Sequence, residues 1–415
     1  MTATFQLDGQ EFTALNGGPV FTPDTACRYA LALSLPRRVG SPGEQVALQH
    51  VAALLERFGF AVERQAFRFA DTLAVLLPLE ILLGQALVLA TLWVRAGHPW
   101  ASLALAGLLV LLLALSSPLN AKARSCSIDP GPDEPAAAWS GLFRRLGPRR
   151  SAANLVARLP GSSARQDLPQ LVLAAHYDSK SQRLPLAVRM ALFALAIGGS
   201  AVFAALTGLS LAAPALAAGL PILAGIVIAS GALLLALGSG NASPGAIDNA
   251  SGVGVALHLA ERLAAERALS SKLSITILVT GAEELGAIGA LAYLRRHGEH
   301  LRRRAHAAGL YILNFDGPGV EGRLCLVGRG SLAGLVREAC RELGYPLVGG
   351  RLPGALLDHE PFTAQGFQAV SLIGIGRASL AVHTPGDTPS RLGLGGFRQA
   401  GEVGLRSIEK IAQIE

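Results

Sequence analysis

Two adjacent carboxylates, Glu283 and Glu284, are the residues in this chain that most directly suggest chemistry. They follow an apolar, β-branched run over residues 273–279, which predicts a buried strand, and they precede a predicted helix over residues 287–294. Open α/β sheets usually build their sites at such turns. One carboxylate could bind a metal ion while the other handles a proton. Taken alone, the pair is better explained as a helix N-terminus, where negative charge is favourable.

Four further candidate ligands stand at the ends of other predicted strands or in adjoining turns. They are His176 after residues 171–175, Asp248 before a predicted helix over 253–268, Asp316 after residues 309–315, and His383 after residues 368–374. Imidazole and carboxylate groups suit zinc, manganese or cobalt. Together with Glu284 they exceed what one tetrahedral zinc needs, whereas two metals about 3.5–4 Å apart that share a bridging carboxylate would use all five.

Each of these residues also has an ordinary structural explanation. A single histidine at a strand end is more often a hydrogen-bonded structural group than a ligand. Asp316 before Gly317 fits turn chemistry, and Asp248 before Asn249 fits a helix N-cap. The five residues stand at successive strand ends or loops of an α/β pattern. It is much less probable that a separate structural explanation holds for each of them than that all five belong to one metal site.

The motifs around these residues resemble, in order and in ligand type, those of the di-zinc aminopeptidase family, which also includes glutamate carboxypeptidases and glutaminyl cyclases. The resemblance covers about residues 28–70, 150–182 and 241–415. It rests on the motifs His176-Tyr177-Asp178-Ser179, Gly245-Ala246-Ile247-Asp248-Asn249-Ala250-Ser251-Gly252, Glu283-Glu284-Leu285-Gly286, Asn314-Phe315-Asp316 and His383-Thr384-Pro385-Gly386-Asp387.

The resemblance implies a role for each residue. His176 and Asp316 would bind one zinc ion, and Glu284 and His383 would bind the other. Asp248 would bridge the two ions, and its peptide bond to Asn249 would be cis. Glu283 would be the general base, and Asp178 would hold the imidazole of His176.

A further segment, Asp358-His359-Glu360-Pro361-Phe362, resembles the family's loop beside the substrate pocket. The family usually has a serine before that aspartate, where this chain has Leu357. The difference concerns substrate preference and leaves the metal ligands unchanged.

The composition points to a membrane. Charged residues make up 16% of the chain, against about 25% in typical soluble proteins, and the mean hydropathy is +0.43. The net charge of +7 is better explained by basic residues near a bilayer than by nucleic acid, because no basic stripe is interleaved with aromatic residues. The four cysteines are scattered and form no Cys-x-x-Cys pair, so they indicate neither a thiolate zinc site nor a redox motif.

Two pairs of apolar runs predict two transmembrane hairpins, the first over residues 73–94 and 100–115 and the second over 186–206 and 212–237. A buried soluble hairpin remains the alternative for the first pair, in which Glu80 is costly in lipid. Residues 118–152 are polar and predict a loop at the membrane surface. Basic residues cluster on the side of the polar segments, so the positive-inside rule predicts a cell-membrane protein whose catalytic domain faces the cytoplasm.

Strands alternate with helices outside the apolar pairs, which predicts an α/β fold with a mixed, mostly parallel sheet covered by helices on both faces. The predicted organisation is a catalytic domain interrupted twice: 1–70 catalytic, 71–117 first hairpin, 118–183 catalytic, 184–240 second hairpin, and 241–415 the main catalytic part.

The predicted function is a membrane-anchored, zinc-dependent exopeptidase, an aminopeptidase before other kinds, with a peptide substrate and the lipid bilayer as partners. Three alternatives stay open: a glutaminyl cyclase using related ligands with one zinc, a receptor-like relative without chemistry, and a transporter. Non-catalytic relatives usually lose ligands that this chain retains, and the predicted spans carry only Glu80 and Arg189 as charges, which is little for an ion path.

Overall fold

The computed structural model of the chain describes residues 4–7, 10–13, 21–130, 140–161, 165, 167–350 and 355–414. The chain forms two compact units. The sheet unit comprises residues 1–66, 152–179 and 243–415, and the helical unit comprises residues 67–151 and 180–242. Each unit therefore contains segments that are far apart in the sequence.

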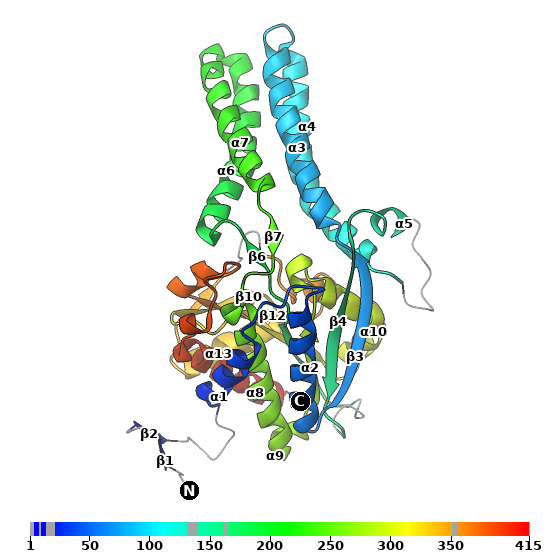
Figure 1. Cartoon of the computed structure of the whole chain (residues 1–415), viewed down its shortest axis with the longest axis vertical. Coiled ribbons are helices and arrows are strands. Elements are labelled where there is room, and N and C mark those ends of the chain that lie inside the picture. Colours follow the sequence, from blue (N-terminus) through cyan, green and yellow to red (C-terminus); the bar gives the residue numbers. More distant parts are fainter. Residues whose placement is uncertain are drawn as a thin grey trace. The chain divides into compact units, whose positions relative to one another are not determined.

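An eight-stranded sheet has the strand order β11-β10-β12-β9-β5-β8-β4-β3 (Figure 1). Its strands are β3 (Ala61–Ala70), β4 (Arg149–Arg158), β5 (Gln170–His176), β8 (Ser274–Thr280), β9 (Leu310–Asp316), β10 (Arg323–Gly328), β11 (Leu347–Gly349) and β12 (Gln368–Ile375). The four central strands β12, β9, β5 and β8 are parallel to one another, while β10 pairs antiparallel with β12 and β4 with β8. The predicted mixed, mostly parallel sheet is confirmed.

The central strands are mostly apolar because both faces of the sheet are buried. All seven residues of β5 and all seven of β8 are buried. Along β5 the side chains alternate between two hydrophobic clusters: Leu171 and Leu173 belong to one, and Val172 and Ala174 to the other. A continuous apolar run therefore supplies two cores at once.

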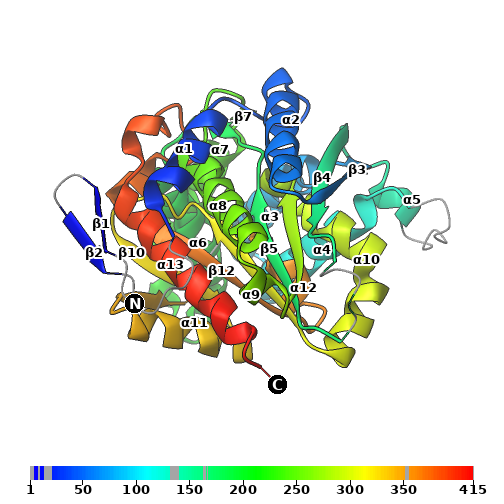
Figure 2. The same cartoon turned by 90° about the horizontal axis from the view of Figure 1, so that it is seen from below.

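Helices cover both faces of this sheet, as the sequence predicts. The first cluster contains residues of α1 (Pro23–Leu33), α2 (Pro42–Arg57), α8 (Gly252–Ala265), α11 (Ser331–Glu342) and α13 (Leu394–Ile411). Figure 2 shows α1, α8 and α13 side by side. The second cluster contains residues of α10 (Ile288–Ala307) and the short helix α12 (Glu360–Thr363).

Helix α2 shows how local sequence sets these boundaries. The side chain of Ser41 accepts a hydrogen bond from the backbone N–H of Glu44 at 3.3 Å and caps the helix, and Pro42 occupies the first turn, where no backbone donor is needed. The preceding segment, residues 34–41, connects α1 to α2. This connection contains Arg37, which is fully buried.

The helical unit contains four segments that are long and apolar enough to cross a membrane: α3 (Leu73–Arg95), α4 (Pro99–Ser127), α6 (Leu186–Ala212), and Pro214–Leu235, which combines the 3₁₀ helix η2 (Pro214–Gly219) with α7 (Leu220–Leu235). Their mean hydropathies are 2.0–2.2. They pack as two antiparallel hairpins into one four-helix bundle (Figure 1). Val88, Leu109 and Phe203, each at most 1% exposed, lie in its core.

The predicted surface loop over residues 118–152 is wrong over much of its described length. Helix α4 continues through Pro118 to Ser127, a short helix α5 spans Ser140–Phe143, and β4 begins at Arg149. Among the polar residues after Pro118, Asn120 is buried and donates hydrogen bonds to Glu80 of α3 and to Ser116, which stabilises this part of α4. Residues 131–139 lie outside the described part of the chain.

Candidate active site

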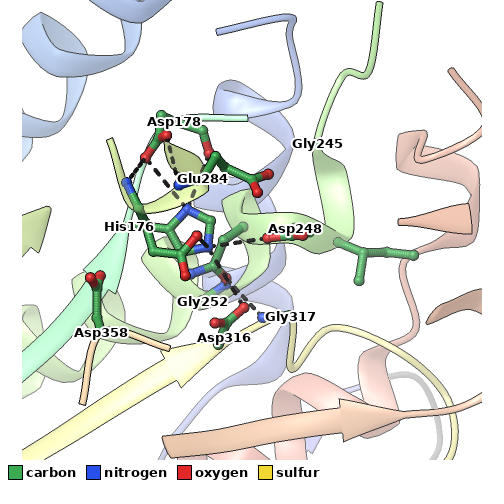
Figure 3. Close-up of polar contacts among 12 residues, drawn as sticks. His176, Asp178, Gly245, Asp248, Gly252, Glu284, Asp316, Gly317 and Asp358 are labelled. Carbon is green, nitrogen blue, oxygen red and sulfur yellow. Dashed lines mark hydrogen bonds and ion pairs between the residues drawn. The ribbon is translucent and has the colours of Figure 1, made fainter. Parts of the chain in front are cut away.

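The candidate site lies at the carboxyl ends of the parallel strands, where α/β sheets place their ligands. His176 is the last residue of β5 and Asp316 the last of β9. These strands pair in register, with Ala174 opposite Asn314, so the two ends lie at the same edge. Figure 3 shows the side chains of His176, Asp248, Glu284 and Asp316 converging from different elements.

His176, Asp248 and Asp316 form the first group of possible metal donors. Nε2 of His176 lies 3.1 Å from Oδ1 of Asp248 and 3.6 Å from Oδ1 of Asp316. The three donor atoms all lie within 4.8 Å of one another, close enough to bind a single cation.

Asp248, Glu284 and His383 form the second group. Nε2 of His383 lies 2.9 Å from Oδ2 of Asp248 and 3.0 Å from Oε2 of Glu284. Asp248 thus turns one carboxylate oxygen toward each imidazole and belongs to both groups. His383 adopts a φ of 63°, which is uncommon for a residue with a side chain and is typical of functional sites.

The turn that carries Asp248 is held by two neighbouring polar residues. The Asp248–Asn249 peptide bond is cis, as the family resemblance implied. The side chain of Asn249 accepts hydrogen bonds from the N–H groups of Gly252 and Gly317, each at 2.9 Å. The carboxylate of Asp387 accepts from the N–H groups of Ile247 at 2.7 Å and Asp248 at 3.2 Å. The resemblance placed Asp387 in a motif, but no role was predicted for it.

The turn that carries Glu283 and Glu284 is a 3₁₀ segment, η4 (Glu283–Leu285), flanked by Ala282 and Ala287 with positive φ values of 58° and 55°. Buried Asp178 stabilises this turn directly. Its carboxylate accepts hydrogen bonds from the N–H groups of Glu283 and Glu284 at 3.1 and 3.2 Å.

The contact between Asp178 and the imidazole of His176 differs from the predicted one. Nδ1 of His176 lies 3.2 Å from the backbone carbonyl of Asp178 and 3.7 Å from its carboxylate. A carbonyl oxygen can only accept a hydrogen bond, so Nδ1–H of His176 donates to it. Nε2 of His176 therefore points toward Asp248 and Asp316, with which it forms the first group of possible metal ligands.

Burial and neighbouring charges move the pKa values of these groups in opposite directions. Burial opposes ionisation of Asp248, but hydrogen bonds from His176 and His383 outweigh it and hold the Asp248 pKa well below its usual range. Burial raises the pKa of Glu283 well above its usual range, and the charges of Asp316 and Glu284 add to the effect. Burial alone would lower the His176 pKa, but the surrounding carboxylates, Glu283 foremost, raise it well above its ordinary value.

These residues fit a pair of divalent metal ions. Asp248, Glu283 and Glu284 are each at most 9% exposed, and buried carboxylates are costly without positive charge beside them. The donors are nitrogen and carboxylate oxygen, which zinc accepts, and the shared carboxylate of Asp248 suits two ions close together. Glu283 lies 3.7 Å from Nε2 of His176 and belongs to neither donor group, so it remains available for a proton.

The loop predicted to lie beside the substrate pocket also reaches this edge of the sheet. Asp358 is 1% exposed and accepts a hydrogen bond from the hydroxyl of Thr280 at the end of β8. Burial raises the pKa of Asp358 to about 7. His359 contacts the hydroxyl of Ser371 at 2.7 Å, and burial lowers its pKa to about 4, so it is neutral at physiological pH.

An α/β sheet whose parallel strands lead to two donor groups around one shared carboxylate, with a further carboxylate beside them, defines a metal-dependent hydrolase. The chain belongs to peptidase family M28, whose model matches residues 154–408, and the enzyme is a metallopeptidase. Among curated protein sequences, none matches it significantly.

Solved structures of similar fold come from several bacteria. A zinc aminopeptidase from Bacillus subtilis is 14% identical with a TM-score of 0.53, over 94% of this chain and 96% of that chain. An aminopeptidase from Aneurinibacillus sp. strain AM-1 is 14% identical with a TM-score of 0.52, over 94% and 93%. A glutaminyl cyclase from an Acidobacteriales bacterium is 14% identical with a TM-score of 0.53, over 98% and 99%. At 14% sequence identity, these similarities show that the chain shares the fold of these proteins.

Proposed function

We propose that this chain is a membrane-anchored, zinc-dependent aminopeptidase that removes N-terminal residues from peptides with the help of two zinc ions. The observation that carries the proposal is the position of Asp248, whose two oxygens lie 3.1 Å from Nε2 of His176 and 2.9 Å from Nε2 of His383. A glutaminyl cyclase that uses one zinc does not need two complete donor groups. The peptidase is therefore favoured over the cyclase.

In this proposal His176 and Asp316 hold one ion, Glu284 and His383 hold the other, and Asp248 contacts both. Bound zinc would supply Lewis acidity that activates water and polarises the peptide carbonyl. Glu283 takes the proton of the attacking water and passes it to the leaving amine. Asp178 keeps Glu283 in place by accepting hydrogen bonds from the N–H groups of Glu283 and Glu284.

The membrane anchor in this proposal consists of two hairpins, over residues 71–117 and 184–240, that interrupt one catalytic domain. Large apolar side chains such as Leu79, Ile197 and Ile222 are 54–71% exposed, which suits lipid better than water. Trp93 and Trp100, beside the turn of the first hairpin, are 86% and 74% exposed, and tryptophan is enriched at membrane–water interfaces. The basic polar segments face the cytoplasm in this arrangement.

The decisive experiment measures zinc content and activity on the same preparation of the full chain in detergent. We expect about two zinc ions per chain, and hydrolysis of a panel of amino-acid amides that chelation abolishes and zinc restores. One ion per chain together with cyclisation of N-terminal glutamine would favour the cyclase. Two ions without turnover of any amide or peptide would favour a non-catalytic relative.

Glu283→Gln tests the proposed base, because the amide keeps the shape of the side chain but cannot take up the proton. We expect turnover to fall about 10²–10⁴-fold while two zinc ions stay bound. Glu299→Gln, on the exposed side of α10, is the control and should leave turnover unchanged. Full activity of Glu283→Gln would remove Glu283 from the mechanism.

A further inference from the structure

Arg37, in the connection between α1 and α2, is a fully buried cation beside the candidate metal site. Its guanidinium donates five hydrogen bonds to backbone carbonyl groups. The acceptors are the carbonyls of Tyr177 at 2.5 Å, Pro244 at 2.6 Å, Gly245 at 2.7 Å, Leu33 at 2.7 Å and Leu35 at 3.1 Å. All five acceptors are backbone carbonyl oxygens and none is a carboxylate. The contacts therefore hold backbone segments in place and are not ion pairs.

Three of these carbonyls belong to the two segments that carry His176 and Asp248. Tyr177 stands between His176 and Asp178, and Pro244 and Gly245 lead into the turn of Asp248. Arg37 therefore joins the end of β5 to the Asp248 turn, although the whole second hairpin separates Tyr177 from Pro244 along the chain.

The backbone of Arg37 makes a second connection to the same place. Its N–H donates to the hydroxyl of Ser179 at 3.1 Å, and the N–H of Ser179 donates to the carbonyl of Arg37 at 3.3 Å. The hydroxyl of Ser179 in turn donates to the carbonyl of Ser243 at 3.3 Å. The segments before and after the second hairpin are thus held by both the side chain and the backbone of one residue.

Gly245 shows how closely the guanidinium fits. A Cβ atom added there would lie 3.1 Å from Nη1 of Arg37, 2.7 Å from Cβ of Ser179 and 2.6 Å from the carbonyl oxygen of Asp248. Its φ of 59° also disfavours a side chain. The Asp248 turn therefore packs directly against Arg37 without room for another group.

We propose that Arg37 is a positioning residue of the metal centre, which fixes the backbone directly after His176 and ahead of Asp248 so that these two ligands converge. The inference rests on the proposed metal site. Only arginine suits this role, because its planar fork offers five donors, whereas lysine offers three from one nitrogen. Burial lowers the pKa of Arg37 to about 10, so the side chain stays charged at neutral pH.

The sign of the effect on metal affinity separates positioning from simple electrostatics. A positive charge near the site repels a divalent cation, so removing the charge alone would strengthen metal binding. Removing a group that holds the ligands in place would weaken it. Arg37→Lys is the sharpest variant, because it keeps the charge and loses the fork, and Arg37→Met removes both.

Arg304 offers a matched control in the same unit. It is 4% exposed and donates to the carbonyls of Arg165 at 2.8 Å and Leu168 at 2.9 Å, ahead of the start of β5 and so at the opposite end of the strand from His176. Arg304→Lys and Arg304→Met should therefore disturb a buried arginine and its carbonyl acceptors without disturbing the ligands.

The experiment uses the full chain in detergent and measures zinc affinity by chelator competition, the visible spectrum of the cobalt-substituted protein, and the thermal midpoint of the metal-free protein. We expect Arg37→Lys to weaken zinc binding about 10–100-fold and to alter the cobalt spectrum, with both properties unchanged in Arg304→Lys.

Three results would overturn the inference: wild-type zinc affinity in Arg37→Lys, equal losses of affinity in the Arg304 variants, or tighter binding in Arg37→Met than in the wild type. If Arg37→Met does not fold, the comparison of the two lysine variants decides alone. Absence of zinc binding in the wild type would contradict the proposed function instead, so the two failures are distinguishable.

Discussion

Three buried ionisable side chains near the site, Arg37, Asp387 and Glu44, belong to neither donor group and have hydrogen-bond partners of different kinds. Arg37 donates to backbone carbonyls. The carboxylate of Asp387 accepts hydrogen bonds from two backbone N–H groups of the Asp248 turn. Glu44 is 1% exposed and accepts from the N–H of Gly40 at 2.6 Å and from the hydroxyl of Tyr177 at 3.3 Å. The backbone that carries the candidate ligands is therefore held by residues that belong to neither donor group.

Glu44 gives a prediction about stability and pH. Burial raises its pKa from 4.5 to about 7. Between these pH values the folded chain holds a proton that the unfolded chain has released, so the contribution of Glu44 to stability is present below pH 4.5 and is lost as the pH rises through 7. The loss is at most about 3 kcal/mol of unfolding free energy. Glu44→Gln cannot lose a proton, so its melting temperature should exceed that of the wild type at pH 8 and approach it as the pH falls below 4.5.

This comparison is made by thermal unfolding of the metal-free chain, so that metal binding does not contribute. Glu63 is the control, because its carboxylate lies on the surface and pairs with Arg158 and Arg296. Glu63→Gln should bring no gain at pH 8. A constant difference between Glu44→Gln and the wild type from pH 5 to pH 8 would contradict the assignment of a raised pKa to Glu44.

At the scale of helices and strands, the sequence predicts most elements because apolar spacing determines them. Strands β5, β8 and β9 coincide with the predicted apolar runs to within one residue at each end. The end of α4 could not be predicted, because Pro118 and the polar residues after it are typical of a loop, and the contact of Asn120 with Glu80 that supports the longer helix joins residues 40 apart in the sequence.

The same reasoning explains which site residues the sequence could indicate. The candidate ligands stand at strand ends or in motifs, and their types suggest metal chemistry without any coordinates. The positioning by Arg37 could not be predicted, because its acceptors are carbonyl groups, which every residue has, and they come from segments separated by the second hairpin. Such a contact leaves no pattern in side-chain types.

Helices α3 and α4 are joined by a polar contact whose strength can be measured. The carboxylate of Glu80 accepts hydrogen bonds from Ser116 at 2.7 Å and from Asn120 at 3.1 Å. In an apolar surrounding these groups have few other partners, so we expect Glu80→Ala and Asn120→Ala to be coupled by about 0.5–2 kcal/mol in a double-mutant cycle. Reversible unfolding in lipid–detergent micelles measures the coupling. Additive effects of the two substitutions would show that the contact is absent in the bilayer.

At the scale of the whole molecule, the chain combines a peptidase sheet with four helices able to cross a membrane. In the proposed arrangement both hairpins return the chain to the side from which it came, so all polar segments share one side of the bilayer. In this proposal the two insertions would connect the catalytic domain to the membrane through four chain segments.

Membrane integration and orientation are tested together in a bacterial host. We expect the chain to stay in the membrane fraction after an alkaline carbonate wash, because four apolar spans are not held by electrostatics. A fluorescent protein fused to the C-terminus should be fluorescent, and alkaline phosphatase fused there should be inactive, if that side is cytoplasmic. Active phosphatase would place the catalytic domain outside, and release by carbonate would contradict the anchor.

The division of the sheet unit among three separate stretches of chain has a consequence for biosynthesis. A ribosome delivers the polypeptide from its N-terminus, and β5 emerges before the strands β8 and β9 with which it pairs. His176 is made before the second hairpin, and Asp248, Glu284, Asp316 and His383 are made after it. A nascent chain thus holds only a fragment of the proposed metal centre until both hairpins have been synthesised, so the proposed peptidase would become competent only after its proposed anchor exists.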